Sequence, residues 1–139
     1  SYLAHLALEN GVRATFIERA NEVNLEMSKY VVDRVQDDNG GSLVGKSVLV
    51  VGVAYKPNIA DVRETAAELV IEHLRSRGAV VSWHDNVVGI WKGERSAPLT
   101  GADIVVVVTM HDSVNSADVI ASAPYVFDTT GKIKGVHGL

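Results

Sequence analysis

The sequence predicts an α/β domain, in which a parallel β-sheet is covered by helices on both faces, preceded by a long helical segment. After residue 46, short runs rich in β-branched residues alternate with a helical pattern. This alternation is typical of βαβ units and therefore of a parallel sheet. Before residue 37, apolar side chains instead recur every three or four residues, which is typical of amphipathic helices.

The helical segment is expected in two parts. A first helix covers residues 2–9 and ends at Asn10 and Gly11, which favour a left-handed stop. A second helix covers residues 15–36. Its apolar stripe consists of Phe16, Ala20, Val23, Met27, Tyr30, Val31 and Val35. So long a stripe offers more apolar surface than one small domain covers, so we expect part of it to pack on another domain or on a second subunit.

A polar, glycine-rich break at residues 37–42 separates this segment from the rest of the chain. We place the domain boundary here, with residues 1–38 as the helical segment and residues 39–139 as a second domain.

The second domain is expected to be a small Rossmann-like domain. A helix is predicted to end at Gly78. The predicted elements are strands at 47–51, 79–83, 104–108 and 125–127 and a helix at 63–77. Ligands of such sheets bind beyond the carboxyl ends of the strands. The segments to consider are therefore 52–63, 84–86, 109–112 and 128–131.

The composition excludes several classes of protein. The net charge is -4 and no basic run exceeds two residues, so a nucleic-acid-binding role is not expected. No apolar stretch is long enough to span a bilayer, and we expect no membrane association. The five histidines are scattered and cysteine is absent, so we predict no metal site and no thiol nucleophile within this chain. The opening residues, Ser1 to His5, read as the middle of a helix, so we expect a fragment of a longer protein.

The segment from Gly52 to Thr65 is too long for a simple connection between a strand and a helix. It contains one glycine where a dinucleotide-binding loop needs three, so it does not predict a standard NAD site. Asp61 and Glu64 have the spacing of a capping box at the helix start. Lys56 and Arg63 are cations near that start, and they are either phosphate ligands or solvated surface residues.

Two further polar pairs follow strands. His84 and Asp85 end the second strand, and we interpret them as the start of a turn. His111 and Asp112 follow the third strand. This pair is either a ligand contact or a helix start with a capping histidine.

The loop residues also resemble a known family, the UDP-glucose and GDP-mannose dehydrogenases. The signature consists of Gly52 to Asn58 and Asp61 to Glu64, and it is accompanied by Gly101 to Asp103 and Thr109 to Asp112. Residues 16–18, 20–24 and 30–32 resemble the central helix of the family. Residues 2–4 and 14–17 resemble the branch that acts on UDP-N-acetylhexosamines, of the UDP-N-acetyl-D-mannosamine type, more than the UDP-glucose branch.

The resemblance implies the C-terminal, UDP-sugar-binding part of a cytoplasmic, NAD-dependent dehydrogenase of polysaccharide biosynthesis, which oxidises a sugar C6 alcohol to a uronic acid. It implies Tyr55 and Lys56 as substrate contacts and Arg63 as a cofactor contact, with no catalytic residue in this chain. The catalytic cysteine and most of the NAD site would lie in missing sequence, so the chain alone should be inactive. The central helix implies a homodimer.

Two residues depart from the family pattern, and one other function remains open. Asn86 stands where proline is usual, and Thr130 stands where relatives often have arginine, which puts that substrate contact in doubt. The alternative function is a free-standing nucleotide-binding or dimerisation module without catalysis.

Overall fold

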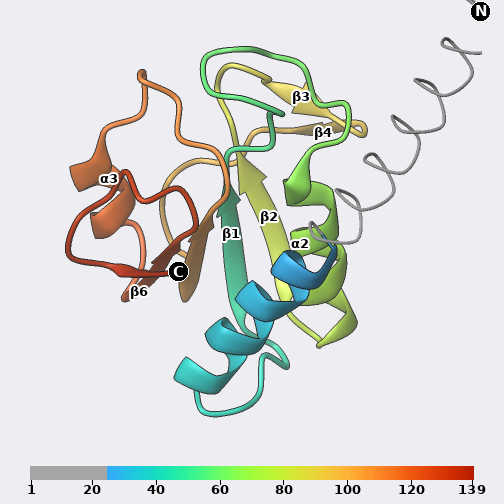
Figure 1. Ribbon diagram of the computed structural model, residues 1–139, viewed down its shortest axis with the longest axis vertical. Helices are drawn as coiled ribbons and strands as arrows, with labels where there is room; N and C mark the ends of the chain where they lie inside the picture. The colour runs from blue at the N-terminus through green and yellow to red at the C-terminus, as the bar shows by residue number, and fades with distance from the viewer. Residues whose placement is uncertain (1–24) are drawn as a thin grey trace, which may run out of the picture.

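The computed structural model describes residues 25–139, and its centre is a five-stranded sheet in the order β2-β1-β5-β6-β7 (Figure 1). All neighbouring strands in it run parallel. The strands are β1 (Ser47–Val51), β2 (Val80–His84), β5 (Ile104–Val107), β6 (Tyr125–Asp128) and β7 (His137–Gly138). The predicted parallel sheet is therefore confirmed.

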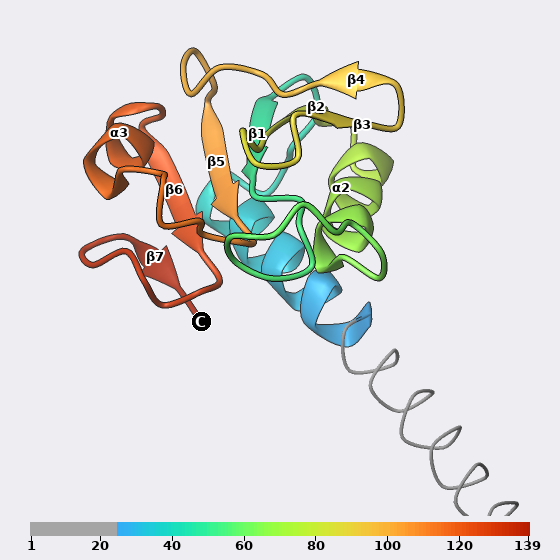
Figure 2. The same ribbon diagram turned by 90° about the horizontal axis from the view of Figure 1, so that it is seen from above.

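Helices cover both faces of this sheet (Figure 2). In β1, Val48 and Val50 point to the face that packs on α2 (Ala66–Ser76), whereas Leu49 and Val51 point to the face that packs on α3 (Ser116–Ala121). Successive side chains of a strand alternate between faces, so a strand covered on both sides must be apolar throughout. This requirement explains the unbroken valine and isoleucine runs of β1 and β5.

A helix at residues 25–38 lies beside α2 on the first face of the sheet. Val31, Val32 and Val35 of this helix are buried in the same core as Val48 and Val50 of β1. Its last turn is also tied to α2, since Arg77 forms an ion pair with Asp33 at 2.6 Å and donates to Gln36 Oε1 at 3.1 Å. Residues 25–36 of the helix predicted at 15–36 are thus helical, as expected. The helix predicted at 2–9 and the first part of that predicted at 15–36 lie outside the described residues.

The start of α2 differs from the sequence prediction. The helix begins at Ala66 rather than Arg63, and its N-cap is Thr65, whose hydroxyl accepts from Ala67 N at 3.3 Å. Glu64 has a left-handed φ of 55°, so the chain cannot be helical at that residue. The capping box predicted from Asp61 and Glu64 is therefore wrong.

A small hairpin lies outside the main sheet and was not predicted from the sequence. Strands β3 (Ile90–Trp91) and β4 (Glu94–Arg95) pair antiparallel and are connected by Lys92 and Gly93. These two residues have positive φ values of 51° and 76°. Two left-handed residues suit the turn of a tight hairpin. Trp91 of the hairpin meets Trp83 of β2 edge to face, with ring centroids 6.0 Å apart.

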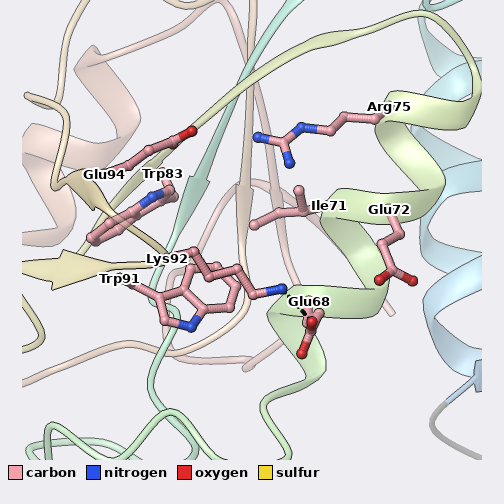
Figure 3. A pocket seen from close by; sticks show the side chains of 8 residues that line it. All are labelled: Glu68, Ile71, Glu72, Arg75, Trp83, Trp91, Lys92 and Glu94. Carbon is pink, nitrogen blue, oxygen red and sulfur yellow. Dashed lines mark hydrogen bonds and ion pairs between the residues drawn. The ribbon is translucent and has the colours of Figure 1, made fainter.

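A cavity of about 140 Å³ lies between this hairpin and α2 (Figure 3). Trp83, Trp91 and Ile71 form its apolar part, and an ion pair between Lys92 and Glu68 spans its rim. The hairpin thus gives Trp83 an aromatic neighbour and borders a small pocket against α2.

Candidate functional site

The order of the strands defines a topological switch point between the carboxyl ends of β1 and β5, which we name the switch crevice. The connection that leaves β1 runs to β2 on one side, whereas the connection that leaves β5 runs to β6 on the other side. Open parallel sheets bind their ligands at the point where the connections leave in opposite directions. The β1 loop (residues 52–65) and the β5 loop (residues 108–115) border this crevice. In Figure 1 the green β1 loop runs across the end of the sheet toward which the β1 arrow points.

The two loops touch at Gly52. This residue has a φ of 86°, and a Cβ at this position would overlap the backbone carbonyl of Thr109. Thr109 Oγ1 also donates to Ala54 O at 2.8 Å. Only glycine fits such an approach, so the first residue of the family-like signature is needed for packing between loops.

The carboxylate of Asp85 accepts hydrogen bonds from the beginning of the β1 loop. Its side chain is fully buried, and Oδ2 accepts from Val53 N at 2.9 Å and from Ala54 N at 3.2 Å. Oδ1 accepts from Val87 N at 3.0 Å and from Val88 N at 2.9 Å, so the expected turn after Asp85 is present. Burial alone would raise the pKa of this carboxyl, but the donors, led by Val88 N and the His111 ring, lower the pKa below its usual value.

His111 connects Asp85 to the tip of the β1 loop. Its ring is 1% exposed; Nε2 lies 2.9 Å from Asp85 Oδ1, and Nδ1 accepts from Asn58 N at 2.7 Å. Both ring nitrogens are therefore used within the chain, and His111 is not free to contact a ligand. Asp112 does not start a helix either, because α3 has Asn115 as its N-cap. The interpretation of this pair as a helix start is therefore wrong, whereas a ligand contact by the exposed Asp112 stays a prediction.

Tyr55 and Lys56 are exposed and directly follow Val53 and Ala54, whose N–H groups donate to Asp85. Tyr55 N donates to Asp61 O at 2.7 Å, while its side chain is 50% exposed. Lys56 Nζ lies 5.5 Å from the centroid of the Tyr55 ring. Among the residues that the structure describes, Lys56 forms no ion pair. Its ammonium group is therefore available to an anion at the crevice.

Arg63 is exposed but already paired within the loop. Its side chain is 87% exposed and forms a salt bridge with Asp61; Nε lies 3.0 Å from Oδ1 and a terminal nitrogen lies 2.7 Å from Oδ2. These bonds and the Arg63 backbone N–H lower the pKa of Asp61 to about 2. The two cations of the loop thus differ, because Arg63 is oriented by a carboxylate, whereas Lys56 has no such partner among residues 25–139.

The end of β6 carries the position that departs from the family pattern. Thr130 turns inward, and both its N–H and its hydroxyl donate to Asp128 Oδ1, at 2.8 Å and 2.7 Å. Asp128 Oδ2 also accepts from Ile133 N at 2.9 Å. Thr130 is therefore committed to a local turn and does not present a cation to the crevice.

Sequence reasoning missed the role of Asn58. This residue has a left-handed φ of 67°, and its Oδ1 accepts from Asp112 N at 2.8 Å. Asparagine tolerates this conformation better than most residues, so an asparagine directly after Lys56 and Pro57 was the available signal. Its partners lie in the β5 loop and could not be identified from spacing.

Comparison with known proteins identifies the family. The sequence model of the UDP-binding domain of the UDP-glucose/GDP-mannose dehydrogenase family matches residues 49–135. The chain belongs to this family. The match includes both loops of the crevice, and the resemblance predicted from the loop signature is confirmed.

Named relatives and solved structures agree with this assignment. UDP-N-acetyl-D-mannosamine dehydrogenase of Methanococcus maripaludis is 31% identical over 134 residues, which cover 88% of this chain and 31% of that protein. UDP-glucose 6-dehydrogenase of Bacillus subtilis is 33% identical over 85 residues, covering 61% of this chain and 18% of that protein. The structure of UDP-N-acetyl-mannosamine dehydrogenase from Staphylococcus aureus has a TM-score of 0.69 at 22% identity, covering 91% of this chain and 34% of that chain, which shows the shared fold.

The match is partial in length. The chain spans less than a third of the length of the curated relatives that it matches. Within residues 25–139, no helix is long and apolar enough to cross a bilayer.

Proposed function

We propose that this chain is the UDP-binding part of an NAD-dependent nucleotide-sugar dehydrogenase, and that Tyr55 and Lys56 contact the sugar nucleotide. One observation carries the proposal: an unpaired lysine stands on an anchored loop at the switch crevice, within the segment matched by the UDP-binding family model. The Lys56 ammonium group can donate charge-assisted hydrogen bonds to pyrophosphate oxygens, and the exposed ring of Tyr55 offers an adjacent apolar face.

The described residues do not offer a pyrophosphate site of the dinucleotide type. Such a site needs free N–H groups in a glycine-rich loop. In the β1 loop as described, Val53 N and Ala54 N both donate to Asp85, and Gly52 is closed off by Thr109. We therefore propose that NAD is held mainly by residues outside this chain. We also propose that Arg63 of this chain contacts NAD, with its guanidinium group oriented by Asp61.

The reaction proposed for the complete enzyme is oxidation of the C6 alcohol of a UDP-sugar to a carboxylate. The names of the relatives favour UDP-N-acetyl-D-mannosamine or UDP-glucose as the substrate. The proposed reaction is a four-electron oxidation, so two equivalents of NAD would each accept one hydride from C6, and water would supply the second oxygen of the carboxylate. This chain contains no cysteine, so the covalent step expected for the family needs another part of the enzyme, and the role of this chain is to hold UDP.

The proposal is tested by calorimetric titration of the chain with UDP. We expect saturable binding, and Lys56→Ala should weaken it by about ten- to a hundredfold, because loss of a charge-assisted hydrogen bond costs about 1.5 to 3 kcal/mol. Arg63→Ala should change UDP affinity much less, since Arg63 is assigned to the cofactor.

Lys46→Ala serves as the charge-matched control. Lys46 directly precedes β1, at the amino ends of the strands and away from the β1 loop. Its Nζ donates to Asn39 O. If Lys56→Ala and Lys46→Ala bound UDP equally well, the assignment of Lys56 would be wrong. Equal losses for Lys56→Ala and Arg63→Ala would contradict the division of the two cations between two ligands.

A further inference from the structure

We propose that His111 is a positioning residue of the candidate site, which holds the tip of the β1 loop in its binding shape through the N–H of Asn58. This inference rests on the proposed function, because its importance depends on Tyr55 and Lys56 being the ligand contacts. His111 itself is buried and does not meet the ligand.

The first support is the way Asn58 is fastened. Its N–H donates to His111 Nδ1 at 2.7 Å, and its Oδ1 accepts from Asp112 N at 2.8 Å. The two bonds join positions 53 and 54 residues apart in the chain. Pro57 alone separates Asn58 from Lys56, and proline has little backbone freedom. Fastening Asn58 therefore limits the directions that Lys56 can take.

The second support is the protonation state that this geometry requires. A backbone N–H can only donate, so His111 Nδ1 must carry no proton. Nε2 then carries the proton of a neutral ring and donates it to Asp85. A carboxylate behind a histidine selects the tautomer in this way at many functional sites. Here the selected tautomer presents an acceptor to the loop.

The third support is that Asp85 is itself immobile. Four backbone N–H groups, from Val53, Ala54, Val87 and Val88, donate to its carboxylate in addition to the His111 ring. The chain of contacts therefore runs from the turn after β2 through the His111 ring to the loop tip, and every member is buried or bonded at both ends. A site held in this manner loses less freedom when a ligand binds.

Two substitutions at His111 separate its two bonds. In His111→Asn, the amide oxygen can replace Nδ1 as the acceptor for Asn58 N, whereas the bond to Asp85 is lost. In His111→Gln, the amide group can replace Nε2 as the donor to Asp85, whereas the acceptor for Asn58 is lost. We expect His111→Gln to speed hydrogen exchange at the Asn58 amide and to weaken UDP binding about three- to tenfold. We expect His111→Asn to stay closer to the unsubstituted chain in both measurements.

His84→Gln is the matched control, because the His84 side chain is also buried but its Nδ1 bonds to Ala97 O rather than to the β1 loop. It should leave the Asn58 amide and UDP affinity unchanged. If His111→Gln and His111→Asn gave the same exchange rate and the same affinity as the unsubstituted chain, His111 would not position the loop. The inference would also fail if His84→Gln reproduced the effects of His111→Gln.

The unsubstituted chain provides a test that does not depend on folding of a variant. ¹⁵N NMR should show an unprotonated Nδ1 on His111 and a scalar coupling across the hydrogen bond to the Asn58 amide, both before and after UDP is added. A protonated Nδ1, or a coupling that appears only with UDP, would overturn the inference. If UDP did not bind at all, the proposed function would fail, while the ring signals and Asn58 exchange would still decide whether His111 holds the loop.

Discussion

Two cations of one loop differ in their contacts because of a single neighbouring carboxylate. Arg63 is held by Asp61 through several hydrogen bonds, whereas Lys56 rests near the face of Tyr55. A solvent-exposed ion pair adds little to folding stability, but it fixes the direction of a guanidinium group. The Asp61–Arg63 pair is therefore better understood as orienting Arg63 than as stabilising the fold.

This pair should be visible in a pH titration. The pKa of Asp61 is lowered from 3.8 to about 2, so the pair contributes fully above pH 3.8 and is lost as the pH falls through about 2. Carboxyl ¹³C NMR of Asp61 should give a midpoint near the lower value, and Arg63→Ala should move it up toward 3.8.

Asp103 provides an internal reference for that titration. Its pKa is lowered by the backbone N–H and the hydroxyl of Ser47, so Arg63→Ala should leave it unchanged. An Asp61 midpoint that did not respond to Arg63→Ala would show that the pair does not persist in solution.

At the scale of single elements, the start of α2 is tied to the candidate site. The Thr65 hydroxyl accepts from Ala67 N at 3.3 Å and donates to Ala54 O at 3.4 Å. One side chain thus ends the β1 loop and caps the helix. The first turn of α2 also carries Glu68, which is favourable at the positive end of the helix dipole.

Removing the Thr65 hydroxyl should therefore cost stability. We expect Thr65→Val to lower the free energy of unfolding by about 0.5 to 2 kcal/mol, as is typical for the loss of an N-cap. Thr65→Ser keeps the hydroxyl and should cost less. Urea unfolding followed by the fluorescence of buried Trp83 measures both values.

Thr100→Val is the control for this experiment, since Thr100 is exposed and caps no helix. It should leave stability nearly unchanged. If Thr65→Val and Thr65→Ser were equally stable, the hydroxyl would not be the group that caps α2.

At the scale of the whole molecule, helix 25–38 has one face in the core and another exposed. Val31, Val32 and Val35 are buried, whereas Leu25, Met27 and Tyr30 are 49%, 45% and 48% exposed. Exposed apolar side chains on a helix are common at subunit interfaces. We therefore propose a homodimer formed through this helix, as the resemblance to the family implies.

The proposal predicts self-association that depends on this face. Sedimentation equilibrium should show dimers whose fraction rises with concentration, and Leu25→Glu should shift the chain toward the monomer. Ile120→Glu is the control, because Ile120 is similarly exposed, at 43%, but lies on α3. A purely monomeric chain at high concentration, or equal effects of the two substitutions, would contradict an interface on this helix.

The sequence by itself determined the class of the fold and the segments that form the site. Runs such as Val48 to Val51 had to become strands covered on both faces, because apolar residues without alternation cannot face water on one side. Local pattern also predicted three other features. These are the helix that ends near Gly78, the break at residues 37–42 and the family-like signature of the β1 loop. These features depend on residues that are neighbours in the chain.

Only the tertiary structure decided which polar groups meet. Asp85, His111 and Asn58 come from three separate loops and are joined because β1 lies between β2 and β5. No local pattern encodes that strand order. The left-handed φ of Glu64 similarly excludes residues 63–65 from α2, so the helix begins at Ala66. Local periodicity specifies which segments are strands and helices, whereas the partners of buried polar groups depend on strand order and loop closure.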